Sequence, residues 1–394
     1  LAPMVVPQLK TITLGGAVTG LGIESTSFRN GLPHESVLEM DILTPTGEIV
    51  TARPGGEHAD HSYADLFRGF PNSYGTLGYS TRLRIELEPV DPFVRLRHVR
   101  FNDLATLQEA MDGIVLRGEY DGTRVDYLDG VVFTTDEAYL VLGVQTPASD
   151  LGPDERPSDY TGMDVYYRSI QHSATRPPKT DLLTIRDYLW RWDTDWFWCS
   201  RAFGAQNPRI RRLWPKRYLR SSFYWKLIGL DQKYDIGDRL EKRKGKPPRE
   251  RVVQDIEVPI ERTAEFVEWF LPETGIEPVW LCPLRLRDTD AARDGPADAQ
   301  PWTLYPLEAE RTYVNIGFWS SVPIVPGTPV GAANRLIERK VSDLDGHKSL
   351  YSESFYSRDE FTRMYGGEDY TRLKRRYDPE SRLLDLYAKA VKQQ

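Results

Sequence analysis

A glycine-rich stretch near the start of the sequence has the composition of a ligand-binding loop. Residues 15–27 read GGAVTGLGIESTS, and Gly31 follows shortly after. Glycine lets a backbone approach a ligand closely and adopt positive φ, and successive free N–H groups suit an anionic or carbonyl-rich ligand. No strand–loop–helix unit surrounds the stretch, so the dinucleotide fingerprint of a Rossmann fold does not apply. Two interpretations stay open: a loop that contacts a cofactor, or tight turns between strands.

Two aromatic stretches in the middle of the chain could contact apolar molecules. Residues 188–198 (YLWRWDTDWFW) carry enough ring surface to wall a flat, apolar substrate, although the same rings could simply fill the core. Residues 209–225 interleave Arg and Lys with Trp, Tyr and Phe, which suits an anionic membrane surface. A solvated basic face is the alternative for this second stretch.

Composition excludes several other kinds of chemistry. Lys and Arg number 51 against 58 Asp and Glu, for a net charge of −7, so we expect no nucleic-acid partner. Two cysteines, Cys199 and Cys282, and six histidines form neither a disulfide framework nor a metal-ligand pattern, so we expect no metal. This cysteine usage fits the cytoplasm, and no apolar run of about 18 residues predicts a membrane-spanning helix.

The elements that would position these stretches follow from apolar spacing and turn residues. In the first 90 residues, 11–14, 37–43, 48–51 and 79–87 are predicted strands and 63–70 a helix capped by Asp60 or Ser62. Next come a strand at 93–101, a helix from Asn102 or Asp103 to Ile114, and a hairpin of 125–133 with 138–144. The same order returns after residue 250 with strands 252–258, 278–286 and 312–319 and helices 260–271 and 332–344.

The repeated strand–helix–strand–strand order predicts an α+β protein. One antiparallel sheet would be built from two similar halves, with helices on one face. Residues 146–250 interrupt the repeat as an insertion, within which 241–251 is read as a charged loop. We therefore expect domains at 1–90 and 91–365, followed by a helical, charged segment at 366–394.

Several motifs together resemble the vanillyl-alcohol-oxidase family of FAD-linked oxidoreductases, most closely its delta(24)-sterol reductases. They are GGAVTGLGIESTSFRNG at 15–31, the Asp65-Leu66-Phe67 helix, SYGTLGYSTRLRIELEP at 73–89 and the block 252–283. A weaker likeness extends to decaprenylphosphoryl-ribose oxidases. The resemblance implies that residues 1–90 are the second half of a PCMH-type FAD-binding domain, and that an antiparallel-sheet substrate (cap) domain follows. It also implies that a segment carrying the pyrophosphate loop belongs before Leu1.

The resemblance assigns cofactor contacts residue by residue. The glycine-rich stretch should run along the flavin and its ribityl chain, Ile49 and Val50 should pack near the adenine, and the turn before the strand at 79 should close the domain. The expected FAD-binding residues are Gly15, Gly16, Ala17, Val18, Gly20, Gly22, Ile23, Ser25, Ser27, Ile49, Val50, Gly75, Gly78 and Tyr79.

On the substrate side, reduction of an isolated alkene needs a hydride from the flavin and a proton from a placed acid. Tyr351 and Tyr356, near the end of the second half of the cap, are the candidates for that acid, and the resemblance to the sugar oxidases makes Tyr351 the first choice. Arg285, on the strand after Trp280-Leu281-Cys282, could stabilise reduced flavin anion. Glu24 and His34 are weaker candidates. For each of these except Tyr351, an ordinary surface or core role is an equal interpretation.

The leading hypothesis is an FAD enzyme that reduces a carbon–carbon double bond of a sterol-like or isoprenoid lipid with NADPH. It would meet its apolar substrate at a membrane through residues 209–225. A second hypothesis is an oxidase or dehydrogenase of a sugar or lipid-linked sugar alcohol, with oxygen or quinone as the redox partner. A third is a non-catalytic binding protein that retains the fold.

Overall fold

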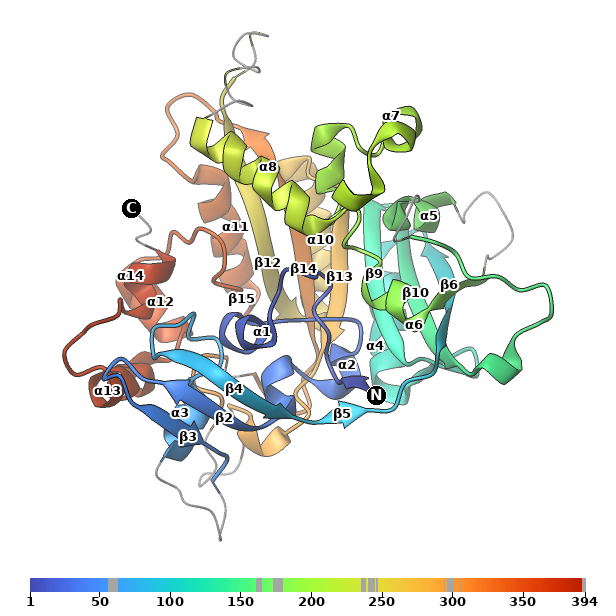
Figure 1. Cartoon of the computed structure of the whole chain (residues 1–394). Coiled ribbons are helices and arrows are strands. Elements are labelled where there is room, and N and C mark those ends of the chain that lie inside the picture. Colours follow the sequence, from blue (N-terminus) through green and yellow to red (C-terminus); the bar gives the residue numbers. More distant parts are fainter. Residues whose placement is uncertain are drawn as a thin grey trace.

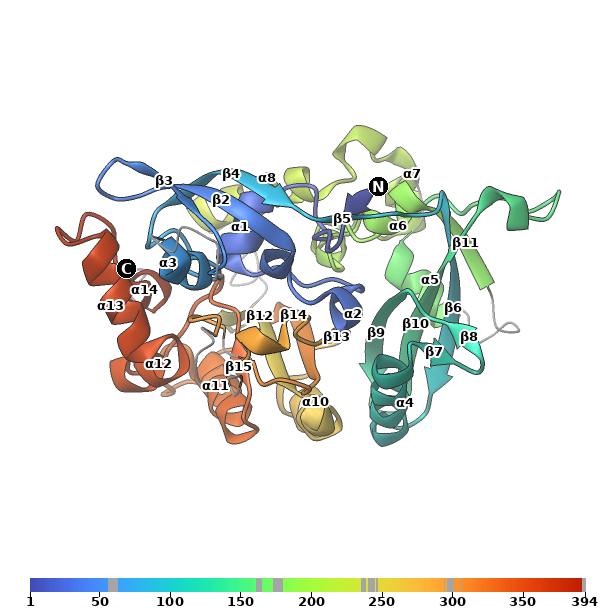
Figure 2. The ribbon, with the colours of Figure 1, turned by 90° about the horizontal axis from the view of Figure 1, so that it is seen from below.

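The computed structural model describes residues 1–55, 63–160, 165–172, 180–234, 239, 245, 247–293, 295, 301–305 and 307–391. A large antiparallel sheet occupies the middle of the molecule, and a small three-stranded sheet lies beside it (Figure 1). Seen from below, helices line one face of the large sheet, while the small sheet lies over the other (Figure 2).

The large sheet has the two predicted halves. The first half consists of β6 (Phe93–Phe101), α4 (Leu104–Arg117), β9 (Tyr127–Thr134) and β10 (Glu137–Thr146); the second consists of β12 (Arg249–Pro259), α10 (Thr263–Thr274), β13 (Val279–Leu284) and β14 (Tyr313–Pro323). The strand order is β11-β6-β10-β9-β13-β14-β12-β15. The halves meet where β13 pairs with β9 through Leu281 and Gly130. The α+β prediction and the repeated order are confirmed.

Helices α4, α10 and α11 (Ala332–Asp343) cover one face of this sheet, as predicted (Figure 2). Alternate strand residues such as Leu128, Leu281 and Ile316 are buried against them, because successive side chains of a strand point to opposite faces. Local signals define α4: the Asp103 side chain accepts from the Thr106 N–H at its start. Other parts of the chain cover the opposite face of the large sheet (Figure 2).

The first 90 residues form the small sheet, with order β3-β2-β4. Its strands are β2 (Val37–Leu43), β3 (Ile49–Ala52) and β4 (Tyr79–Ile85), with α3 (Ala64–Gly69) between the last two; β5 (Leu87–Glu88) pairs with β1 (Ala2–Pro3). The predicted hairpin of 37–43 with 48–51 is confirmed. The predicted capping residues Asp60 and Ser62 lie outside the described residues.

The predicted strand at 11–14 is wrong, and the loop expected after it is helical as far as Gly20. Residues Leu14–Gly20 form helix α1, and α2 (Ser27–Asn30) follows. The Thr13 hydroxyl caps α1 by accepting from the Gly16 N–H at 3.0 Å. Gly15 lets the helix approach β4, because a Cβ there would lie 2.7 Å from the Ser80 Oγ. Capping and close packing therefore outweigh the β-branched Thr-Ile-Thr run, which favours a strand.

The insertion covers the sheet face opposite the helices. Its described elements are α5 (Tyr166–His172), β11 (Thr180–Thr184), α6 (Ile185–Leu189), α7 (Pro208–Leu213) and α8 (Ser221–Tyr234). The short hairpin of β7 (Glu119–Tyr120) and β8 (Thr123–Arg124) lies outside the insertion. Of the charged run at 241–251, residues 241–244 and 246 lie outside the described residues, and β12 already begins at Arg249.

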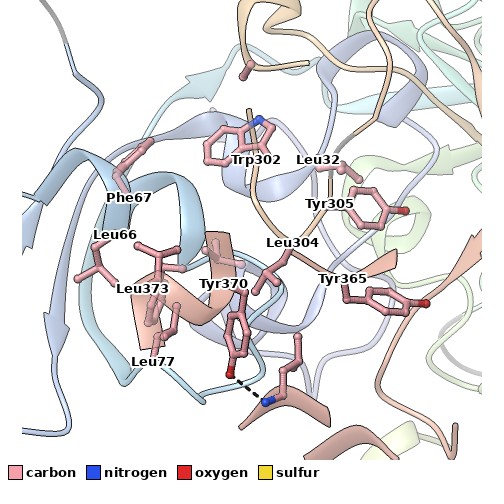
Figure 3. Packing of buried hydrophobic residues seen from close by; sticks show 14 of the residues in the cluster. Leu32, Leu66, Phe67, Leu77, Trp302, Leu304, Tyr305, Tyr365, Tyr370 and Leu373 are labelled. Carbon is pink, nitrogen blue, oxygen red and sulfur yellow. Dashed lines mark hydrogen bonds between the residues drawn. The ribbon is translucent and has the colours of Figure 1, made fainter. Parts of the chain in front are cut away.

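The C-terminal part is helical, as predicted, and packs with the first 90 residues. It contains α12 (Arg358–Met364), α13 (Gly367–Tyr377) and α14 (Leu386–Ala390), after the short strand β15 (His347–Lys348). Tyr370 and Leu373 of α13 lie against Leu66, Leu77 and their neighbours in one buried cluster (Figure 3). The C-terminal helices and the first 90 residues therefore share one hydrophobic core.

Candidate functional site

Polar side chains gather on the sheet face that α4, α10 and α11 leave free. Asp255 and Glu257 project from β12 on this face, because Val252, Ile256 and Val258 between and beside them face the helices. On β14, Asn315 and Gly317 lie directly opposite Glu257 and Asp255 in the strand register. This placement builds a group of ionisable side chains where the large sheet meets the rest of the molecule.

Tyr351 reaches this group directly. Its hydroxyl donates to the Asp255 Oδ2 at 3.0 Å, and Asn315 Nδ2 donates to the other carboxylate oxygen at 3.3 Å. Gly317 makes room for the carboxylate, since a Cβ there would lie 2.4 Å from Asp255 Oδ1. Burial, and then the Asp255 charge, raise the pKa of Tyr351 well above its usual range, although 38% of the residue stays exposed.

Glu257 is the most enclosed member of the group. It is fully buried, and Ser349 Oγ donates to its Oε1 at 3.1 Å. Burial raises the pKa of Glu257 well above its usual range, and the nearby Asp255 charge raises it further. His347 Nε2 lies 3.8 Å from Oε2, but burial lowers the pKa of that imidazole to about 4. His347 is therefore neutral near pH 7 and provides no compensating charge.

Tyr74 connects Tyr351 with the glycine-rich stretch. The Leu350 N–H donates to the Tyr74 hydroxyl at 2.9 Å, and the Tyr74 N–H donates to the Thr19 carbonyl at 2.8 Å. A Cβ at Gly20 would lie 3.6 Å from the Tyr74 ring. Tyr74 thus links the predicted cofactor stretch with the residue before the predicted proton donor.

A buried ion group fixes the other end of the same stretch. Arg191 Nη2 lies 3.0 Å from Glu24 Oε1 and 2.7 Å from Asp129 Oδ2, and the Arg191 side chain is fully buried. Its guanidinium carbon also lies 4.1 Å from the centre of the Tyr188 ring. Arg191 therefore ties the insertion to residues 24–27 and to β9.

The residues expected to bind FAD fall into three groups by exposure. Ile49 and Tyr79 are 63% and 55% exposed, and Gly16 is exposed as well. Ala17, Val18, Gly22, Ser25, Ser27, Val50, Gly75 and Gly78 are buried inside the chain; Gly15, Gly20 and Ile23 are intermediate. Ser25 Oγ lies 2.8 Å from the Tyr188 hydroxyl, and Ser27 Oγ accepts from the Glu24 N–H at 3.1 Å.

Gly78 has a demonstrable structural role. Its φ is +130°, and a Cβ there would lie 2.4 Å from the Leu43 carbonyl oxygen. Gly75, at φ +76°, makes the same turn into β4. These glycines let the backbone fold tightly between β2 and β4, whatever else they contact.

The exposed subset is compatible with a flat, partly apolar cofactor. Gly16 of α1 exposes its backbone, since it has no side chain. Ile49 begins β3 and Tyr79 begins β4, and both pair with Leu43 at the end of β2. Their exposed side chains provide apolar surface. The buried subset packs inside α1 and the residues after it and gives this surface its shape.

The other predicted residues differ in their surroundings. Arg285 forms an ion pair with Glu310 at 2.6 Å, and Tyr356 lies in the core shared with the C-terminal helices, 6.2 Å from the Tyr365 ring centre. His34 stacks edge-on against Trp302 at 4.5 Å, and burial, with help from Arg68, lowers its pKa to about 3. Of Tyr351, Tyr356 and Arg285, Tyr351 is the one with a hydrogen bond to Asp255.

The aromatic run at 188–198 packs as core. Trp192, Trp196 and Trp198 are at most 6% exposed and belong to one buried cluster. The run contacts the sheet where Trp196 meets Trp319 and Phe197 meets Trp280. Sequence reasoning missed Tyr74, Asp255 and Glu257. The two acids could have been found, because apolar residues at 252, 256 and 258 place positions 255 and 257 together on the opposite face of the predicted strand.

Comparisons with known proteins extend along nearly the whole chain. No family model matches it. It is 26% identical to delta(24)-sterol reductase of Rattus norvegicus, over 98% of this chain and 69% of that protein. The identity to delta(24)-sterol reductase is 27% for Mus musculus and 25% for Arabidopsis thaliana, with the same coverage. Cytokinin dehydrogenase 5 of Oryza sativa subsp. japonica is 30% identical over 34% of this chain and 24% of that protein. The resemblance to the delta(24)-sterol reductases is confirmed.

Proposed function

We propose that this chain is an FAD-dependent oxidoreductase acting on CH–CH groups, which reduces a carbon–carbon double bond of a sterol-like or isoprenoid lipid with NADPH as electron donor. The observation that carries the proposal is the likeness to delta(24)-sterol reductases over 98% of the chain. The Tyr351–Asp255 contact supports it, because it supplies an acid that Tyr74 links to the expected cofactor stretch.

Bound FAD would supply hydride chemistry. Gly16, Ile49 and Tyr79 would contact it directly, and the buried residues from Ala17 to Ser27 would hold the shape of that surface. Tyr351 would give its hydroxyl proton to the alkene carbon that does not receive the hydride. Tyr74, by fixing both Leu350 and Thr19, would keep Tyr351 at a constant distance from the cofactor surface.

Turnover of a defined substrate tests this proposal. Full-length protein is incubated without oxygen with FAD, NADPH and a sterol that has a side-chain double bond at the position named for the relatives. Mass spectrometry should show a product that has gained two hydrogens, and Tyr351→Phe should form it at least about 100-fold more slowly. Oxidation of a sugar alcohol with oxygen or quinone, without sterol reduction, would instead establish the alternative oxidase.

The surface of α7 and α8 is part of the same proposal, as a peripheral contact with an anionic membrane. Leu213 is 85%, Trp225 60% and Leu230 49% exposed. The basic residues Arg209, Arg212, Lys216, Arg217, Arg220 and Lys226 lie among them in a chain of net charge −7. Both helices lie at the top of the molecule in the view of Figure 1. Exposed apolar rings beside cations suit lipid headgroups.

A row of aromatic rings connects this surface with Tyr351. The Trp225 ring lies 5.8 Å from Trp196, which lies 5.2 Å from Trp319, and Trp319 lies 6.5 Å from Tyr351. Trp196 is buried, so these rings connect α8 with the proposed acid as packed core. Among the described residues, no helix is both long and apolar enough to span a membrane.

Flotation with vesicles tests the membrane contact. We expect the protein to float with anionic vesicles at low salt, and to float less at high salt, because salt screens the cations. Leu213→Ser combined with Trp225→Ser should abolish flotation. Leu116→Ser is the matched control, since Leu116 is 62% exposed on α4. Wild-type protein that stays at the bottom of the gradient would contradict the contact.

A further inference from the structure

Two acids beside Tyr351, the half-buried Asp255 and the fully buried Glu257, have no role in the proton transfer to the alkene. Asp255 and Glu257 are two residues apart on one face of β12, and Asp255 Oδ2 lies 3.0 Å from the Tyr351 hydroxyl oxygen. A tyrosine that gives up its proton must regain one before the next turnover. The exposed fraction of Tyr351 is 38%, so water reaches the tyrosine, but a carboxyl group is already in contact with the atom that loses the proton.

The surroundings of the two acids contain little positive charge. Facing them are Asn315 from β14, His347 and Ser349 from β15 and the residues after it, and the rings of Tyr74, Tyr305 and Tyr365. Lys348 is the nearby cation, and its Nζ is committed to Glu338 at 3.1 Å and to the Glu353 carbonyl at 2.7 Å. His347 is neutral near pH 7. If both carboxylates were ionised, Lys348 would be the nearby cation that lowers the pKa of Glu257, and its Nζ is shared with Glu338 and the Glu353 carbonyl.

We propose that Asp255 and Glu257 form a proton store that recharges Tyr351. This inference rests on the proposed function, in which reduced flavin supplies the hydride. The Tyr351 O–H bond breaks as a substrate C–H bond forms. The Asp255 O–H bond then breaks as the Tyr351 O–H bond is restored, and the Asp255 carboxylate takes its replacement proton from Glu257 or from water. Asp255 and Glu257 are thus positioning residues that act through Tyr351.

The electrostatics of the pair are consistent with a stored proton. Burial raises the pKa of both carboxyl groups, and the Asp255 charge raises that of Glu257 further. When two carboxyl groups share a buried site, one pKa rises strongly because both cannot ionise together. When Asp255 carries the proton, its contact with Tyr351 reverses, so that Asp255 donates and the tyrosine hydroxyl is free to face a substrate.

Infrared spectroscopy tests the stored proton without turnover. The carboxyl C=O band of a protonated acid is recorded near pH 7 for full-length wild type, Asp255→Asn and Glu257→Gln. We expect a wild-type band that is missing from at least one variant. Tyr377→Phe is the control, because Tyr377 makes a comparable hydrogen bond to Asp65, 2.7 Å away between α13 and α3. Spectra in which neither variant lacks a band that the wild type shows would overturn the proton store.

Stopped-flow kinetics test what the store does. Flavin reduction by NADPH should be unchanged in Asp255→Asn, whereas flavin reoxidation by the lipid should slow about 100-fold. The optimum pH of reoxidation should also shift in Glu257→Gln. Variants that reoxidise like a reactive wild type, with an unmoved pH profile, would overturn the proton store alone. A wild type that never reacts with the lipid counts instead against the proposed function.

Discussion

The buried ion group of Arg191, Glu24 and Asp129 gives the sharpest prediction about stability. Replacing Arg191 with Met keeps much of the side-chain volume but removes the cation from two carboxylates that are 3% and 1% exposed. Removing one partner of a buried ion pair costs about 3–5 kcal/mol, because the remaining charge stays buried without compensation. Whole domains are stable by about 5–15 kcal/mol, so the loss is a large share of the total.

The same substitution should make stability depend on pH. Burial already raises the pKa of Glu24, and Arg191 is the first of the groups that lower it. Without Arg191 the folded protein holds a proton on Glu24 that the unfolded chain releases above about pH 4. Stability of Arg191→Met should therefore fall as pH rises from about 5 to 8, while at pH 5 it should be closer to the wild type.

Urea unfolding followed by tryptophan fluorescence measures both effects. We expect Arg191→Met to lose about 3–5 kcal/mol at pH 8 and less at pH 5. Adding Glu24→Gln and Asp129→Asn to Arg191→Met should recover much of that loss, since no buried charge then remains. An Arg191→Met protein whose free energy of unfolding stays within about 1 kcal/mol of the wild type at pH 8 would refute the reasoning.

Two further substitutions test the turn into β4 and the buried imidazole. Gly78→Ala should lower the free energy of unfolding by about 2 kcal/mol or more, because φ is +130° and the new Cβ meets the Leu43 carbonyl; Gly47→Ala, with φ +92° and open space around it, should lose only about 1 kcal/mol. A thermal melt that ranks them in the opposite order would contradict this. The pKa of His34 is lowered to about 3, so wild-type stability should fall as pH drops from 6.5 toward 3, by up to about 1.4 kcal/mol per pH unit. His34→Phe should flatten that slope in acid unfolding curves, and an unchanged slope would argue against a buried, neutral His34.

Much of the fold could be predicted, since apolar spacing reports which face of an element is buried. The strand at 93–101 matches β6 in both bounds, and the helix starting after Asp103 matches α4 because its capping residue is local to it. Strand 252–258 was predicted too short, since β12 begins at Arg249, where exposed charged residues hide the pairing with β14.

The errors and omissions arise where contacts distant in sequence decide the structure. Thr11–Leu14 favours a strand locally, but α1 forms because Gly15 allows contact with Ser80. At Trp196, Phe197 and Trp198 the backbone has φ of +43°, +49° and +63°, which no propensity of aromatic residues predicts. The rings of all three are buried in the core, and that packing holds the conformation in place.

In the candidate site, too, some residues could be predicted from the sequence and others depend on contacts between distant parts of the chain. Tyr351 was predicted from a family resemblance, and the structure gives it a carboxyl partner from β12 and a link through Tyr74 to the Gly20 segment. The role of Tyr74 depends on residues about 276 positions apart in the chain, so no local pattern could indicate it. The cofactor contacts of residues 15–27 and 75–79 stay predictions.

The visible absorption spectrum of the purified full-length protein tests the central proposal most directly. It is recorded after reconstitution with FAD and again after NADPH is added without oxygen. The proposed function predicts flavin absorption bands that stay with the protein through gel filtration and bleach on addition of NADPH. A protein that retains no flavin, or whose flavin bands NADPH leaves unchanged, would contradict it.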